Sequence, residues 1–103
     1  SLHTVRWASE ITFEILDESG TQLCKGGPYR ENGVEYPVNG CSLPSLITVK
    51  CYDSYGDGWH GGYLQIGDKE VCKDFRSGSI KTVQVELPFA TYDFSSTGGF
   101  SGN

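Results

Sequence analysis

The sequence lacks the features of a membrane-spanning or nucleic-acid-binding protein. No apolar run approaches the roughly 18 residues that a membrane helix needs. The eight Lys and Arg residues form no basic run, and the net charge is −5. A nucleic-acid-binding face is therefore not expected. Methionine is absent and the chain begins Ser-Leu-His-Thr-Val, so we expect a processed product from which a secretory signal was removed.

Cysteine is scarce but even in number. The four residues are Cys24, Cys41, Cys51 and Cys72, and no two have C-x-x-C spacing. Because the two histidines are also far apart in sequence, a zinc site is the less favoured alternative. Four cysteines in a short, Gly-rich chain favour two disulfides and an oxidising, extracellular compartment. Three pairings are open; we prefer Cys24–Cys41 and Cys51–Cys72, because each closes a local excursion between neighbouring strands.

No window keeps apolar residues at the spacing of an amphipathic helix. Apolar and polar residues alternate instead, as in strands with one buried face. The alternation predicts strands at residues 11–16, 47–51, 64–66, 70–75 and 83–87, and weaker ones at 2–7 and 34–38. Residues 25–44 should otherwise form a long loop. About seven or eight short antiparallel strands predict an all-β fold, a β-sandwich or jelly roll with two disulfides.

The end of the chain has a different composition. We expect residues 1–88 to form the sandwich and residues 89–103, rich in Gly, Ser and aromatic residues, to form a tail. The tail could pack on its own domain or link to a neighbouring copy by strand addition, through the aromatic residues Phe89, Tyr92, Phe94 and Phe100. No N-x-S/T sequon is present, but Ser95, Ser96 and Thr97 are candidate O-glycosylation sites.

The stretch Asp-Ser-Tyr-Gly-Asp-Gly-Trp-His-Gly-Gly, residues 53–62, contains more than a chain reversal needs. Ca²⁺ takes six to eight oxygen ligands. In a glycine-rich loop, Asp53 and Asp57 would supply two carboxylates, and Asp68 and Asp74 from the following hairpin could complete the set. The alternative is a plain turn, in which the aspartates only accept hydrogen bonds from nearby backbone N–H groups.

The loop is not an EF-hand. With Asp53 at loop position 1, Tyr55 falls at position 3 and Leu64 at position 12, where a bidentate Glu is required. No helices flank the loop either. We therefore predict a loop-type Ca²⁺ site on a β scaffold.

Aromatic residues cluster around the same loop. Trp59, Tyr55 and Tyr63 could stack on sugar rings, or they could fill the core and shield the loop. A Ser54–His60–Asp57 triad would be crowded into one loop, without a nucleophile elbow or an oxyanion-hole motif. We therefore predict no enzymatic activity.

Residues 53–61 resemble the D-S-Y/F-G-D-G-W-N-G motif of many secreted and cell-surface β-sandwich proteins, with His60 where Asn is usual. A strand at residues 11–16, the Gly-Gly-Pro-Tyr segment 26–29 and Cys41 extend the resemblance upstream. The resemblance implies an extracellular, repeat-prone, non-catalytic module. The domain is also similar, more weakly, to subunits of extracellular fibres that polymerise by donating a strand.

These observations predict a non-enzymatic extracellular structural protein. We expect a homo-oligomer or filament subunit with a Ca²⁺ loop, linked by a terminal strand or tail. The alternative is a Ca²⁺-dependent carbohydrate-binding or adhesion module that recognises glycans.

Overall fold

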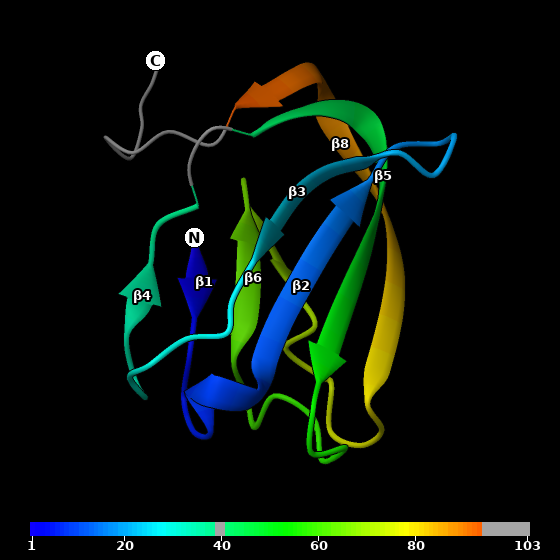
Figure 1. Cartoon of the computed structure of the whole chain (residues 1–103). Coiled ribbons are helices and arrows are strands. Elements are labelled where there is room, and N and C mark those ends of the chain that lie inside the picture. Colours follow the sequence, from blue (N-terminus) through cyan, green and yellow to red (C-terminus); the bar gives the residue numbers. More distant parts are fainter. Residues whose placement is uncertain (39–40, 94–103) are drawn as a thin grey trace.

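Two four-stranded antiparallel sheets make up the fold (Figure 1) in a computed structural model that describes residues 1–38 and 41–93. The first sheet has the order β4-β1-β6-β7 and consists of β1 (Leu2–His3), β4 (Glu35–Tyr36), β6 (Tyr63–Ile66) and β7 (Lys69–Val71). The second has the order β3-β2-β5-β8 and consists of β2 (Ile11–Leu16), β3 (Gln22–Gly26), β5 (Ser42–Asp53) and β8 (Ile80–Asp93). The predicted all-β fold with seven or eight strands is confirmed.

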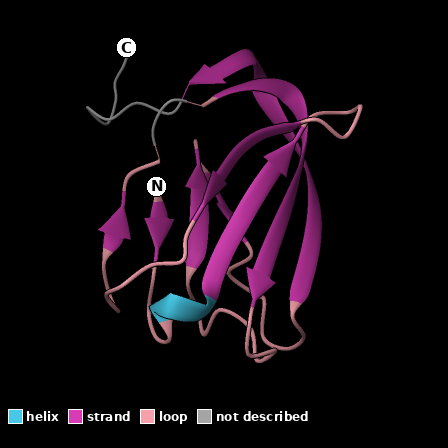
Figure 2. Cartoon of the chain, viewed as in Figure 1, coloured by secondary structure: helices cyan, strands magenta, loops and turns pink. Residues whose placement is uncertain are grey.

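The described chain is otherwise loop, apart from the 3-10 turn η1 (Ala8–Glu10) (Figure 2). This turn precedes β2 at the end of the sandwich where β5 also finishes. This arrangement brings Glu10, the residue before β2, next to Asp53, the last residue of β5.

Alternating residues of the two sheets form one core. The second sheet buries Ile11, Phe13 and Ile15 from β2, and Ile47, Val49 and Cys51 from β5. The first sheet buries Leu2, Leu64 and Ile66, and Trp59 and Phe75 join the same cluster from loops. Each large apolar side chain contributes roughly 1.5–3 kcal/mol by burial, so the two-residue period of the sequence becomes the inner face of each sheet.

Both predicted disulfides are confirmed. Cys51 in β5 bonds to Cys72, directly after β7, and so ties the second sheet to the first. Cys24 in β3 bonds to Cys41, the residue before β5. Two disulfides are consistent with an extracellular location.

The prediction of a long loop at residues 25–44 is only partly confirmed, because both ends of this segment lie in strands. Its first two residues belong to β3, which pairs with β2 although only Cys24 of that strand is buried. Its last three residues begin β5, where the pairing with β8 shifts register between Pro44 and Leu46. Proline and irregular pairing are typical of bulged strand ends, and they obscure the alternation.

Three other predicted strands are shorter than expected. The chain leaves β1 after His3, β4 covers only Glu35–Tyr36, and β7 ends at Val71. Cys72 then adopts a left-handed backbone with φ 66°, which a continuing strand cannot accommodate.

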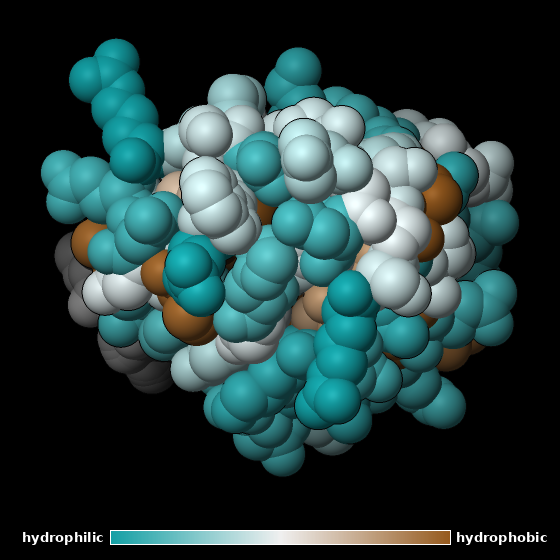
Figure 3. Space-filling model, turned by 90° about the horizontal axis from the view of Figure 1, so that it is seen from below, coloured by the Kyte–Doolittle hydropathy of each residue, from teal (hydrophilic) through white to brown (hydrophobic). Residues whose placement is uncertain are grey.

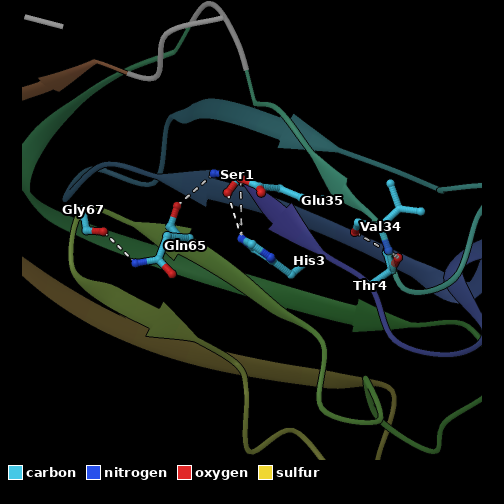
Figure 4. A network of polar contacts seen from close by, with 7 residues as sticks. All are labelled: Ser1, His3, Thr4, Val34, Glu35, Gln65 and Gly67. Atoms are coloured by element: carbon cyan, nitrogen blue, oxygen red, sulfur yellow. Dashed lines mark hydrogen bonds and ion pairs between the residues drawn. The ribbon is translucent and has the colours of Figure 1, made fainter. Parts of the chain in front are cut away.

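Polar contacts hold the short strand β1 in the middle of its sheet (Figure 4). The amino group of Ser1 donates to the carbonyl of Gln65 at 3.1 Å, and the Ser1 hydroxyl lies 3.0 Å from His3 Nε2. The Thr4 hydroxyl donates to the Val34 carbonyl at 3.2 Å. The amino group of Ser1 and the hydroxyl of Thr4 therefore add bonds to β6 and to the residue before β4, on either side of a strand that has few ladder bonds of its own.

Strand β8 continues past Pro88 to Asp93, so the backbone of residues 89–93 belongs to the sandwich. Thr91, Tyr92 and Asp93 pair with Pro44, Leu43 and Ser42 of β5. The rest of the predicted tail, including Phe94, Phe100 and the candidate glycosylation sites Ser95, Ser96 and Thr97, lies outside the described residues.

Removing either disulfide should destabilise the fold, but not equally. The sequence separations of 21 and 17 residues are similar, so loop closure contributes about 3 kcal/mol in each case. Cys51→Ala with Cys72→Ala should cost more than Cys24→Ala with Cys41→Ala. Both Cys51 and Cys72 are buried, so their loss leaves a cavity between the sheets, whereas Cys41 is only partly buried. Urea unfolding followed by tryptophan fluorescence measures both; a larger loss for the Cys24–Cys41 pair would contradict this account.

Candidate metal centre

The loop at residues 53–62 begins on a fully buried acidic residue. Asp53 ends β5, is 0% exposed, and lies opposite Ile11 of β2. Its backbone N–H donates to the Ser79 carbonyl at 2.9 Å. Its carboxylate accepts N–H bonds from Asp57 at 2.6 Å and Tyr55 at 3.2 Å. The loop therefore folds around the Asp53 carboxylate.

Gly58 fixes how closely this loop packs on the segment before β8. The residue has φ +85°, and a Cβ placed on it would lie 2.4 Å from the Phe75 carbonyl oxygen. The next residue, Trp59, donates its backbone N–H to that same oxygen at 2.8 Å. A side chain at position 58 would meet both a strained backbone and a close contact.

Trp59 anchors the loop in the core rather than facing solvent. Its side chain is 0% exposed, and its ring centroid lies 6.1 Å from that of Phe75. The indole Nε1–H donates to the Tyr52 carbonyl at 2.9 Å, which satisfies the buried donor. Of the two roles that the sequence left open for Trp59, a stacking face for a ligand or a core residue, the structure shows the core residue.

Three carboxylates converge at this end of the sandwich. Glu10 from η1, Asp53 from β5 and Asp57 from the loop each place a carboxylate oxygen within 4.8 Å of the others. Glu10 Oε1 and Asp57 Oδ1 are buried and have no hydrogen-bond partner among the described residues. His60 borders the group, with Nε2 3.2 Å from Asp57 Oδ2.

The pKa values of Glu10 and Asp53 are shifted in opposite directions. Burial raises the pKa of Glu10, and the hydrogen bond and negative charge of Asp53 raise it further. Burial also opposes ionisation of Asp53, but hydrogen bonds from Asp57, Tyr55 and Glu10 outweigh it and leave the pKa of Asp53 below its ordinary value. Without a cation, a proton on Glu10 therefore relieves the repulsion in the cluster.

Only two of the four predicted metal ligands lie in the carboxylate cluster. Asp53 and Asp57 lie together as predicted, but Asp68 and Asp74 are not part of the cluster. Asp68 is exposed in the β6–β7 turn, and Asp74 lies 3.7 Å from Lys81 Nζ. The third carboxylate is instead Glu10, which sequence reasoning missed. Its signal is the pairing of the strands at residues 11–16 and 47–53, because antiparallel register places Ile11 opposite Asp53.

The remaining aromatic candidates occupy different environments. Tyr55 is 77% exposed beside the cluster, whereas Tyr63 stacks on His3 at 4.4 Å and lies under Lys73 Nζ at 4.9 Å. Trp7, not considered from the sequence, is half exposed with a left-handed backbone. Viewed from this end, the surface is mostly polar with small, separate apolar patches (Figure 3).

No family model, curated protein or solved structure matches the chain. Within the described residues, no helix is long and apolar enough to span a membrane.

Gly58→Ala should destabilise the protein more than Gly56→Ala. Gly56 has φ +89° and Gly58 has φ +85°. An alanine at either position should therefore lower the free energy of unfolding by about 1–2 kcal/mol, because it must adopt a left-handed backbone. Only the Cβ at position 58 overlaps backbone, since nothing lies within 4 Å of the Cβ position at Gly56. The overlap should add about 1–3 kcal/mol. Chemical denaturation measures the difference, and equal losses for the two variants would contradict the tight packing of the loop.

Proposed function

We propose that the chain is a secreted, non-enzymatic structural module, a subunit of an extracellular assembly, whose loop end binds Ca²⁺ through Glu10, Asp53 and Asp57. The observation that carries the cation site is the convergence of three carboxylates from separate segments, with two buried oxygens that have no hydrogen-bond donor among the residues that the structure describes. Asp53 is fully buried and Glu10 and Asp57 are partly buried. Three carboxylates held this close together are costly unless a proton, a donor or a cation compensates their charge.

The chemistry of the cluster favours a hard cation. All three side chains offer carboxylate oxygens, the ligands that Ca²⁺ takes in irregular geometries, with backbone carbonyls and water completing the shell. Mg²⁺ demands a stricter octahedral arrangement, for which a glycine-rich loop is less suited. In this proposal the ion serves a structural purpose, linking η1, the end of β5 and the following loop.

Several features support the assembly part of the proposal. The disulfides suit an oxidising environment. The motif at residues 53–61 resembles that of secreted, repeat-prone modules. The sheets end in open strands within the described chain, and such edges readily pair with other chains.

Ca²⁺ should raise the thermal stability of the chelated protein at pH 7. At a free concentration tenfold above Kd the gain is about 1.4 kcal/mol, or roughly 5–10 °C in Tm for a chain of this size. Glu10→Gln and Asp57→Asn should abolish the gain. Asp68→Asn is the matched control and should keep it, because Asp68 is exposed and outside the cluster. An equal gain in Glu10→Gln, or no gain in the wild type, would contradict the proposed site.

The same experiment has a pH dependence. Because the pKa of Glu10 is raised in the fold, the neutral carboxyl contributes stability at pH below about 4.5, the ordinary Glu value. The contribution is lost as the pH rises through the folded pKa. Ca²⁺ should take the place of the Glu10 proton, so the stabilisation by Ca²⁺ should increase as the pH rises from about 4.5 through the folded pKa of Glu10. In Glu10→Gln this pH-dependent increase should be absent.

A second candidate function is Ca²⁺-dependent carbohydrate binding. The exposed ring of Tyr55 favours it, as does a hollow of about 540 Å³ beside the cluster, lined in part by Glu10, Tyr52 and Ile80. A bound cation could orient sugar hydroxyls while Tyr55 stacks on a ring. The burial of Trp59 counts against this function, since it removes the largest expected stacking face.

Electron microscopy of the full chain, with and without EDTA, separates the two functions. A structural subunit should form regular fibres or other large assemblies. If the cation braces the subunit, chelation should weaken or disperse them. Single 11 kDa particles in both conditions would contradict the assembly and leave carbohydrate binding as the better account.

A further inference from the structure

The outer face of the second sheet has an open hollow at the end that carries the carboxylate cluster. Its volume of about 540 Å³ lies within the range of about 300–1,000 Å³ that is typical of small-molecule sites. Three neighbouring strands (Figure 1) form its floor, because Tyr52 of β5 lies opposite Thr12 of β2 and opposite Ile80 of β8. Tyr52 alternates with the buried residues Cys51 and Asp53, so its side chain lies on the face that points away from the core.

The Tyr52 ring is held in one position on this face. Its hydroxyl donates to the Glu14 carboxylate on β2, so the ring leans from β5 toward β2. This hydrogen bond, together with partial burial, raises the pKa of Tyr52 to about 12, so the hydroxyl keeps its proton at neutral pH. An aromatic ring whose orientation is already fixed can bind the apolar face of a ligand without the cost of ordering a side chain.

Two further residues extend the apolar part of the hollow. Ile80 is 49% exposed and lies beside Tyr52 in the sheet. Pro28 lies at the β2 side of the hollow. Gly27, the residue before it, packs so closely on β2 that a Cβ on Gly27 would lie 2.3 Å from the Ile11 carbonyl oxygen. The position of Pro28 is therefore fixed against the start of β2.

Hydroxyl groups surround this apolar floor. Ser9, Ser54 and Ser79 are exposed residues of the lining. Backbone bonds hold two of them in place, since Ser54 donates its N–H to the Glu10 carbonyl at 3.1 Å and the Ser79 carbonyl accepts the N–H of Asp53 at 2.9 Å. An apolar floor with a few polar groups at fixed positions suits a ligand with an apolar face and a polar edge. A sugar ring has this character, because its C–H bonds form a face and its hydroxyls form the edge.

The charges around the hollow discriminate between kinds of sugar. None of the described residues that line it is Lys, Arg or His, whereas Glu10 and Asp53 are acidic. Glu14, bonded to Tyr52, adds a third carboxyl group at the border. A uronate or a sulfated sugar would bring a negative charge next to these groups without a compensating side chain, and such a juxtaposition lowers affinity. A neutral sugar avoids this repulsion.

We propose that the hollow on the outer face of the second sheet binds a neutral pyranose unit of a glycan, whose apolar face stacks on Tyr52. Ile80 and Pro28 would flank the sugar ring, and the hydroxyls of Ser54 and Ser79 would bond to its edge. The inference rests on the carbohydrate-binding candidate described above and makes it specific. The stacking residue is Tyr52 rather than Tyr55, the ligand is neutral, and no bound cation is required.

NMR titration of the ¹⁵N-labelled full chain in EDTA tests this site. The probes are the neutral oligosaccharides cellotetraose, mannotetraose and chitotetraose, and the acidic tetragalacturonate. At least one neutral probe should shift the amide signals of Thr12, Ser54 and Ser79 with a millimolar Kd, and tetragalacturonate should bind at least about tenfold more weakly. Shifts confined to other parts of the chain, or tighter binding of tetragalacturonate, would overturn the inference. So would the absence of shifts with every neutral probe at about 10 mM, a concentration above a millimolar Kd.

Two variants remove parts of the floor. Tyr52→Ala should weaken binding of the neutral probe by at least about tenfold and Ile80→Ala by about threefold or more, because each removes apolar surface. Leu46→Ala is the matched control, since Leu46 is 42% exposed in β5 and lies outside the hollow, and should leave the Kd unchanged. Circular dichroism checks that the variants fold. If Tyr52→Ala does not, Ile80→Ala decides, and an affinity equal to that of Leu46→Ala would contradict the site.

The same measurements separate this inference from the proposed function. Binding of a neutral probe in EDTA would support the hollow whether or not Ca²⁺ stabilises the protein. Binding that appears only after Ca²⁺ is added would overturn the inference and favour the Ca²⁺-dependent candidate. Fibres in electron microscopy without binding of a neutral probe would overturn the hollow as a sugar site and keep the assembly.

Discussion

The buried carboxylate of Asp53 is the constraint on which the loop end of the sandwich depends. A fully buried charge is tolerated only where donors surround it, and here the N–H groups of Tyr55 and Asp57 do so. Because these two N–H groups must point back at the Asp53 carboxylate, the chain turns sharply directly after β5. The curl carries Gly58 and Trp59 onto Phe75, so one buried charge decides how a loop joins the core.

The same constraint creates an excess of negative charge. Glu10 is the last residue of η1 and directly precedes β2. Because β2 pairs with β5 and Ile11 lies opposite Asp53, this pairing places Glu10 next to the Asp53 carboxylate. The raised pKa of Glu10 reflects burial and its acidic neighbours, and a cation would compensate both.

The sequence predicted what depends on local pattern and missed what depends on register. The alternation in β2 and β5 is regular, so those strands and the disulfide pairing were predictable. Asp53 and Asp57 were predictable as a pair because one short loop holds both. Glu10 was not, since only strand pairing brings it close. The residues next to Trp59 in the sequence are compatible with either a core residue or an exposed aromatic face. The structure shows a core residue, because Trp59 packs against Phe75.

The most direct test of the account is isothermal titration calorimetry of Ca²⁺ into the chelated full chain, with Glu10→Gln as the comparison. Glu10 is the informative position because, unlike Asp53, its carboxylate holds no loop backbone bond among those described. The account predicts one ion per chain and loss of binding in Glu10→Gln. No binding at millimolar Ca²⁺, or unchanged binding in Glu10→Gln, would contradict it.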